Sequence, residues 1–362
     1  MAKSGVKPGD PGTRRLMTTR LTHRVDRGAG RRRRRVVTNV GRGPTVDGVT
    51  GLGADPVAIG AAHTALLYRG AVEYLAAVLP FVRAGVAAGD AVIVAAPAAN
   101  LAMLREESAA EGFAADVRWL DMAEVGGNPG RIVPAVLHPV LDRAARVVTE
   151  VVWPKRPWAQ YASCVRHEAL ANRLLDGREL RLLCPYDAAA LDDSVLADAL
   201  ATHPGVLDRG GYRASTDYAP EAALASHGAP LIEPVRAESL LVGIGELGAA
   251  RALVSARARA HGLAEQRVGD AALVVTELVT NSIEHGGGEA TLSVWSADGE
   301  LVFQVRDGGK LADPLAGLRP APIDQAHGRG LLLVQTLADL VTIHSAGDGT
   351  VVRAHFTRSS GA

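Results

Sequence analysis

The chain is poor in cysteine, in aromatic residues and in long hydrophobic runs, and each shortage excludes a class of protein. Two cysteines among 362 residues, Cys164 and Cys184, are too few for the disulfide framework of a secreted protein. No apolar run reaches the length of about 18 residues that a membrane span needs. Aromatic residues make up 4% of the chain, so Ala, Val and Leu must fill the core. We therefore expect a globular, cytoplasmic protein with no membrane partner.

Lys and Arg are scarce outside the N-terminal segment. Residues 1–43 carry 13 Lys and Arg against 2 Asp and Glu, which leaves 26 against 37 in the rest of the chain. The body is therefore acidic, and we expect no direct nucleic-acid partner for it. The leader, residues 1–55, lacks the apolar region of a signal peptide, and its Gly, Arg and Thr content predicts disorder. A solvated tail, a start codon placed too far upstream, and a nucleic-acid or lipid tether all remain open.

The length of the chain exceeds what one hydrophobic core usually serves, which favours two domains. We place the first domain at residues 56–205 and the second at residues 236–358. Residues 206–235 separate them as a linker, because His, Pro, Gly and Ala follow one another there with little periodicity.

Strand and helix patterns alternate in the first domain. The run AVIVAA at 91–96 is typical of a buried strand, and the pattern at 132–145 predicts a helix that leads into a strand at 146–153. An earlier helix has an apolar stripe made of Val72, Leu75, Val78, Leu79 and Val82. Continuous apolar strands separated by helices predict an α/β domain with a mainly parallel sheet covered on both faces.

The second domain has a different order of elements. Helices are expected at 247–260 and 265–284, and strands follow at 290–295 and 301–306. A Gly- and Pro-rich loop then leads to a helix at 329–337 and two last strands. Helices that cover one face of a largely antiparallel sheet predict an α+β domain.

Three polar clusters stand in order in this second domain: ELVTN at 277–281, DGG at 307–309 and GRGLLLV at 328–334. Glu277 and Asn281 are four residues apart on a helix and share one face, where a carboxylate and an amide suit a magnesium site. An ordinary polar stripe on a surface helix has the same pattern. Asp-Gly-Gly alone is equally typical of a turn.

Together these clusters resemble the Bergerat-fold (GHKL, HATPase_c) ATP-binding domains, and the wording ELVTNSIEHG resembles their anti-sigma-factor kinases. The resemblance implies a Bergerat sandwich that binds ATP and Mg²⁺, with Glu277 as general base and Asn281 on the metal. It also implies that Asp307 binds adenine. The other implied contacts are Gly309, Gly328, Arg329, Gly330, Leu331 and Thr350. Residues 310–327 resemble the ATP lid. Leu311 stands where the family usually has a glycine, which puts the hinge of that lid in doubt.

A serine/threonine protein kinase fits this chain better than two other members of the superfamily. A histidine kinase needs a long helical hairpin that carries its histidine, whereas His203 and His227 lie among Pro, Gly and Ala. Gyrase-like relatives add a transducer domain, and only five residues follow Thr357. The resemblance implies a sigma factor and an anti-anti-sigma protein of the STAS type as partners, and a homodimer is also considered. A catalytically inactive ATP-binding regulator and a metabolite-sensing module remain as alternatives.

The first domain is similar to the MEDS sensory domains, a degenerate RecA-like module. The similarity is carried by the stretch 63–94, by NPGR at 128–131, by EVVWPKR at 150–156, and by HEALAN at 167–172 with CPYD at 184–187. It implies a small-molecule ligand. The strand at 91–96 is followed by PAAN, not by the glycines and lysine of a phosphate loop, so we expect no nucleotide there.

Two further sites in this domain are weighed. Cys164 and His167 are three residues apart on an expected helix, and Cys184 and Asp187 end a strand, so a metal or redox site can be imagined. Core and helix-face positions explain the same residues more simply. Trp153, His167, Glu168 and Tyr186 are better candidates for a ligand pocket, because ligands of open α/β sheets bind at the carboxyl ends of the strands.

Overall fold

A computed structural model describes residues 62–319 and 328–358. The predicted disorder of residues 1–55 lies outside the described residues. So do Pro320 and Pro322 of the expected lid.

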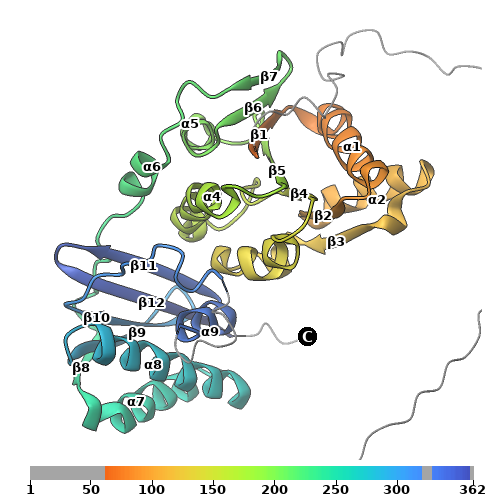
Figure 1. Cartoon of the computed structure of the whole chain (residues 1–362). Helices are drawn as coiled ribbons and strands as arrows, with labels where there is room; N and C mark the ends of the chain where they lie inside the picture. The colour runs from red at the N-terminus through yellow and green to blue at the C-terminus, as the bar shows by residue number, and fades with distance from the viewer. Residues whose placement is uncertain (1–61, 320–327, 359–362) are drawn as a thin grey trace, which may run out of the picture. The chain divides into compact units, whose positions relative to one another are not determined.

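The first sheet has seven strands in the order β3-β2-β4-β5-β1-β6-β7 (Figure 1). All neighbouring strands run parallel except β7, which is antiparallel to β6. The predicted mainly parallel α/β domain is therefore confirmed. The strands are β1 (His63–Tyr68), β2 (Ala91–Ala96), β3 (Val117–Asp121), β4 (Ala145–Thr149), β5 (Leu180–Asp187), β6 (Gly205–Asp208) and β7 (Gly211–Ala214).

Helices cover both faces of this sheet, and each face has its own core (Figure 1). In β2, Val92 and Val94 point to the face that carries α1 and α2, whereas Ile93 and Ala95 belong to the core on the opposite face. Both sets of side chains are buried, which explains the continuous apolar run. The helices are α1 (Gly70–Ala88), α2 (Ala98–Ala110), α3 (Met122–Val125), α4 (Tyr161–Leu175), α5 (Asp193–Thr202) and α6 (Pro220–Ser226).

Helix α1 is long and apolar enough to cross a membrane, with a mean hydropathy of 1.5, and no other helix of the described residues meets that test. Its Tyr74, Val78 and Phe81 are buried in the core between α1 and the sheet. The predicted stripe is wrong at Val72, which is 68% exposed, because the buried face begins at Glu73 and Tyr74.

Two expectations for this half of the chain are wrong. Residues 132–145 do not form one helix. Short π and 3-10 turns at Val133–Leu137 and His138–Val140 replace it. Pro134 and Pro139 explain the break, because each removes a backbone N–H and clashes with the preceding turn.

The predicted linker is also wrong over much of its length. Strands β6 and β7 and helix α6 lie within residues 205–226, and β6 pairs with β1 near the β7 edge of the chain's first sheet. These elements are short, so their periodicity is hard to recognise in a sequence. The strand expected at 146–153 ends at Thr149.

The second sheet has five strands in the order β11-β12-β10-β9-β8, and all neighbours are antiparallel (Figure 1). Helices α7 and α8 pack on one face, which confirms the predicted α+β arrangement. The elements are β8 (Glu238–Val242), α7 (Leu247–Ala260), α8 (Glu265–His285), β9 (Ala290–Ala297), β10 (Glu300–Asp307), α9 (Gly330–Leu337), β11 (Leu340–Ala346) and β12 (Gly349–Thr357).

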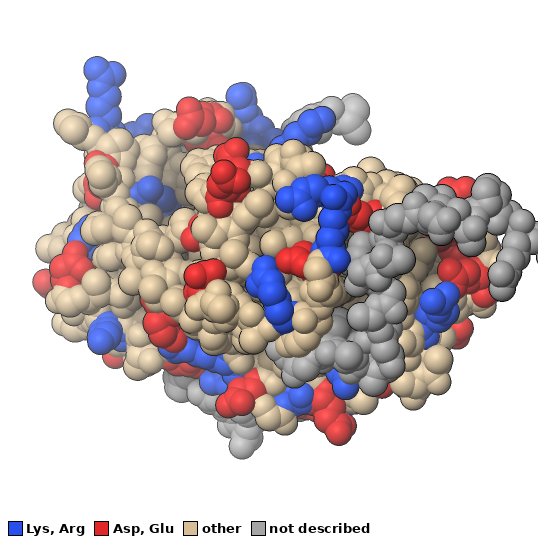
Figure 2. All heavy atoms as spheres, turned by 90° about the horizontal axis from the view of Figure 1, so that it is seen from above, with Lys and Arg blue, Asp and Glu red and all other residues tan. Residues whose placement is uncertain are grey.

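Charged side chains of both signs are interspersed on the face seen in Figure 2, with no continuous patch of one sign among the described residues there.

Candidate nucleotide site

A cavity of about 440 Å³ opens in the second domain between α8, the end of β10, the start of α9 and the start of β12. The structure brings all nine predicted site residues together in its lining. They are Glu277, Asn281, Asp307, Gly309, Gly328, Arg329, Gly330, Leu331 and Thr350.

Helix α8 places Glu277 and Asn281 at this cavity. Its opposite face is buried in the core through residues such as Val275 and Val279, which fixes the rotation of the helix about its axis. Both polar side chains are half-buried, and neither hydrogen-bonds to another described residue. The start of α9 approaches them closely. A Cβ atom on Gly330 would lie 2.6 Å from Oε2 of Glu277 and 3.1 Å from Nδ2 of Asn281. Only a glycine leaves room here for both side chains.

Asp307 is the last residue of β10, and two hydrogen bonds orient its carboxylate. Ser282 donates from Oγ to Oδ2 over 2.6 Å, and the backbone N–H of Gly309 donates to Oδ1 over 2.8 Å. Gly286 also lies against this carboxylate, since a Cβ atom there would be 2.4 Å from Cγ of Asp307. The antiparallel register sets Asp307 opposite Thr350.

Thr350 holds the loop after Asp307. Its hydroxyl donates to the carbonyl oxygen of Gly309 over 2.9 Å, so Ser345 must be the donor in the 2.8 Å contact between the two hydroxyls. Ser345 in turn accepts the N–H of Leu311 over 2.9 Å. Leu311 does not have a positive φ. A leucine therefore takes the usual glycine position without backbone strain.

Sequence reasoning missed Ser282, Gly286 and Ser345 as parts of this site. A local signal exists for Ser282, which follows Asn281 directly and so projects about 100° further around the helix. Ser345 becomes recognisable only through the pairing of β11 with β12. His285, which belongs to the motif wording, contributes its backbone: a Cβ atom on Gly309 would lie 2.5 Å from its carbonyl oxygen.

The lining suits a nucleotide with bound magnesium. Apolar walls from Leu278, Val305 and Val352 can enclose a base, and the Asp307 carboxylate can accept the hydrogen bond of an exocyclic amine. At the other side, Asn281 offers an amide oxygen, a hard ligand for Mg²⁺. The N-terminus of α9 begins beside it at Gly330, and free N–H groups of a helix start favour phosphate oxygens.

The two sites considered in the first domain are not assembled as expected. Tyr186 donates to Oε1 of Glu168 over 3.3 Å, but Trp153 lines a separate cavity of about 160 Å³. Within the described part of the chain, neither ring nitrogen of the buried His167 has a hydrogen-bond partner. Cys164 lies 3.9 Å from the carbonyl oxygen of Val151 and takes no part in a metal cluster among the described residues.

The two halves of the chain match two different family models. Residues 62–204 match MEDS, the MEthanogen/methylotroph, DcmR Sensory domain. Residues 244–356 match the histidine kinase-like ATPase domain. The chain therefore carries a MEDS domain followed by a histidine kinase-like ATPase domain, as both resemblances implied.

Two solved structures align with the chain at low sequence identity. The RsbU and RsbW domains of Rv1364c from Mycobacterium tuberculosis align over 34% of this chain and 34% of that one, with 18% identity and a TM-score of 0.26. This chain thus spans about a third of their length. The histidine kinase AdeS from Acinetobacter baumannii aligns over 58% of this chain and 88% of that one, with 10% identity and a TM-score of 0.20. No curated protein matches the sequence.

Proposed function

We propose that the chain is an anti-sigma regulatory serine/threonine protein kinase. It binds ATP with Mg²⁺, phosphorylates an anti-anti-sigma protein of the STAS type and sequesters a sigma factor, under the control of its MEDS domain. One observation carries the proposal: Glu277 and Asn281 project from one face of α8 into the cavity that Asp307 also lines. The motif wording ELVTNSIEHG around them supports the choice of kinase class.

Each of the three residues has a separate task in this proposal. Asp307 binds the adenine amine, and Asn281 holds the Mg²⁺ that arrives with ATP and screens its phosphate charge. Glu277 accepts the proton of a serine or threonine hydroxyl as that oxygen bonds to the γ-phosphorus and the bond to ADP breaks. Because Glu277 has no hydrogen-bond donor among the described residues, its carboxylate is available to a substrate. Positioning and electrostatics supply most of the catalysis in such transfers.

The acceptor is assigned to a partner protein because of the segment that precedes the ATPase domain. Residues 215–246 form helix α6 with seven residues, strand β8 and a single 3-10 turn, so this segment has no long helix for a phosphorylated histidine. His203 is buried, and His227 is paired with Asp198 at 2.8 Å. Neither histidine belongs to the described residues that line the nucleotide cavity.

The test is a transfer assay with the full chain, radiolabelled ATP and a panel of STAS-type proteins. We expect acid-stable label on one of the STAS proteins, and about 10- to 100-fold less of it when Asp307→Asn replaces the wild type at an ATP concentration below saturation. Acid-labile label on this chain would instead indicate histidine kinase chemistry. If Mg-ATP binds by calorimetry but no protein is labelled, the chain is an inactive ATP-binding regulator and the proposal is wrong.

Further parts of the proposal concern regulation and location. A small-molecule ligand of the MEDS domain is the proposed signal, a homodimer is a proposed assembly, and the cytoplasm is the proposed compartment. A pull-down of sigma factors with and without ATP measures sequestration separately from transfer.

A further inference from the structure

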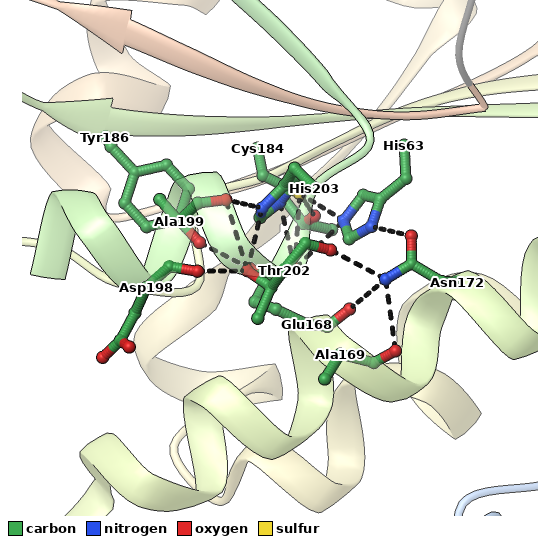
Figure 3. A network of polar contacts seen from close by, with 11 residues as sticks. His63, Glu168, Ala169, Asn172, Cys184, Tyr186, Asp198, Ala199, Thr202 and His203 are labelled. Carbon is green, nitrogen blue, oxygen red and sulfur yellow. Dashed lines mark hydrogen bonds and ion pairs between the residues drawn. The ribbon is translucent and has the colours of Figure 1, made fainter. Parts of the chain in front are cut away.

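Four buried polar side chains meet in the MEDS domain, far in sequence from the nucleotide cavity. They are His63 at the start of β1, Glu168 on α4, Cys184 on β5 and His203 at the end of α5 (Figure 3). One ligand atom from each lies within 4.8 Å of the other three. None of the four residues is more than 1% exposed.

Hydrogen bonding fixes which ring nitrogen of His63 carries the proton. The side-chain N–H₂ group of Asn172 donates to three backbone carbonyl oxygens, those of Glu168, Ala169 and Thr202. Its Oδ1 therefore faces Nδ1 of His63, at 3.1 Å, as an acceptor. Nδ1 of His63 must be the donor, and in the neutral ring Nε2 presents a lone pair. That lone pair points at Oε2 of Glu168 (3.1 Å) and Sγ of Cys184 (3.4 Å).

The same reasoning applies to His203. Its Nδ1 lies 2.8 Å from the carbonyl oxygen of Ala199 and 3.0 Å from Oγ1 of Thr202. Thr202 donates its own proton to the carbonyl oxygen of Asp198, so both neighbours accept from the ring. The lone pair of Nε2 is again directed to the cluster. This nitrogen lies 3.5 Å from Oε2 of Glu168 and has no hydrogen-bond partner among the described residues.

Two imidazole lone pairs and a carboxylate thus converge, and the Cys184 thiol, 3.6 Å from Oε2 of Glu168, brings a single weak donor to these three acceptors. A proton on Nε2 of His63 would form an ion pair with Glu168 but would leave Nε2 of His203 without a partner among the described residues. A cation at the centre of the four side chains satisfies all of them at once.

We propose that His63, Glu168, Cys184 and His203 bind one Zn²⁺ ion. Bond lengths of about 2.0–2.3 Å in a tetrahedral zinc site separate the ligand atoms by roughly 3.3–3.7 Å. Four distances between ligand atoms are close to that spacing. They are 3.1 Å from His63 to Glu168, 3.4 Å from His63 to Cys184, 3.5 Å from His203 to Glu168 and 3.6 Å from Cys184 to Glu168. Binding releases the Cys184 proton to solvent, and the thiolate and carboxylate together balance the charge of the ion.

Each ligand also has an outer hydrogen bond of the kind that orients metal ligands in proteins. Asn172 and Ala199 hold the two rings, as described. Tyr186 donates to the second oxygen of Glu168 (Figure 3). Thr149 lies 3.3 Å from the sulfur of Cys184. Mixed nitrogen, sulfur and oxygen ligands favour Zn²⁺ over Mg²⁺ or Ca²⁺, which take oxygen ligands. Four protein ligands in a fully buried site indicate a structural ion that joins β1, α4, β5 and the end of α5.

The experiment measures metal in the purified full chain. After expression with added zinc and extensive dialysis, elemental analysis should give about one zinc per chain for the wild type and for Cys164→Ser, and little for Cys184→Ser. Cys164 is the matched control, because both cysteines are completely buried but only Cys184 belongs to the cluster. Substitution with Co²⁺ should add a thiolate-to-cobalt absorption band in the wild type and Cys164→Ser that is missing from Cys184→Ser.

A measurement on the wild type alone covers the case in which a variant does not fold. Removal of the ion with a chelator should lower the melting temperature of the MEDS domain, and added zinc should restore it. The proposal is overturned if the folded wild type retains no stoichiometric zinc, if bound Co²⁺ lacks the thiolate band, or if Cys184→Ser binds zinc as the wild type does. A buried polar network without metal would then explain the cluster. None of these readouts depends on kinase activity.

Discussion

Ser282 hydrogen-bonds through its hydroxyl to Oδ2 of Asp307 over 2.6 Å, and so connects helix α8 to the end of strand β10. The other oxygen of that carboxylate accepts the N–H of Gly309. One bond comes from the helix and one from the loop, so the carboxylate is oriented before any ligand arrives. Each oxygen keeps a further lone pair for a ligand.

The first prediction concerns Asp307→Asn. The amide keeps the shape of the carboxylate but loses the charge. Its N–H₂ group takes the place of one accepting oxygen, so it faces either the hydroxyl of Ser282 or the N–H of Gly309, which are both donors to Asp307 in the wild type. We expect ATP affinity by calorimetry to fall by roughly 1.5–3 kcal/mol, about 10- to 100-fold. Ser282→Ala, which removes one orienting bond and keeps the charge, should cost less, about 0.5–1.5 kcal/mol. Unchanged affinity in Asp307→Asn would rule out the adenine assignment.

The second prediction concerns Gly330→Ala. The new Cβ atom meets the flexible end of Glu277, so the fold survives but the carboxylate is displaced. A displacement of about 1 Å at a reacting group lowers transfer on the order of 10²-fold. Gly269→Ala on α8 is the matched control, because nothing lies within 4 Å of its added Cβ atom. That variant should keep wild-type transfer and gain about 0.5–1 kcal/mol of stability. Equal rates for both variants would contradict the close packing of α9 against Glu277.

The third prediction concerns Glu150, a carboxyl group in the MEDS domain that is only 1% exposed. Asn100 donates to both of its oxygens over 2.8 and 3.0 Å, and the hydroxyls of Tyr68 and Tyr74 contact it at 3.3 Å. Burial outweighs these donors and raises its pKa to about 7. The folded state therefore holds a proton that the unfolded state releases near pH 4.5.

It follows that the contribution of Glu150 to stability is complete below about pH 4.5 and is lost as the pH rises through 7. Glu150→Gln cannot ionise, so its stability should exceed that of the wild type increasingly from pH 5 to pH 8. The change over this range is on the order of 3 kcal/mol. Urea unfolding of both proteins across the pH range measures it, and parallel curves would show that Glu150 titrates normally.

The nucleotide site could be predicted from the sequence because its residues lie in short local patterns. Glu277 and Asn281 are one helical turn apart, and Asp307 directly follows an apolar strand. The metal cluster offers no such pattern. His63 lies 105 residues from Glu168 and 121 from Cys184, so only the finished sheet brings them together. Cys184 was singled out from its sequence neighbours, but with Cys164, His167 and Asp187 as companions, none of which is in the cluster.

One error in the fold has a local cause, and another depends on long-range pairing. The apolar spacing continues through Pro134 and Pro139, so it predicts a helix there in spite of the two prolines. The strand β6 has only four residues, GVLD, and its place beside β1 depends on a pairing between residues about 140 apart. Turn residues around such a strand are also typical of a linker.

The last prediction separates the tasks of Glu277 and Asn281, which share one helix face and one cavity. Glu277→Gln keeps the shape and helix propensity of the side chain but removes its capacity to accept a proton. Transfer to the STAS partner should fall by about 10²–10⁴-fold while calorimetry still detects Mg-ATP binding. Asn281→Ala removes the proposed metal ligand, so Mg²⁺-dependent binding and transfer should be lost together.

The control in this comparison is the proposed binding of a sigma factor, measured with Glu277→Gln. We expect this binding to persist at wild-type affinity, because it would depend on a protein surface and not on the proton-accepting carboxylate. A variant that had simply unfolded would lose capture as well as transfer. If Glu277→Gln phosphorylates the partner at the wild-type rate, Glu277 is not the base, and a carboxylate elsewhere or the phosphate itself must take the proton. If Asn281→Ala binds ATP in the presence of Mg²⁺ as tightly as the wild type does, other groups hold the metal. The two single variants thus distinguish proton transfer from metal binding on the same turn of α8.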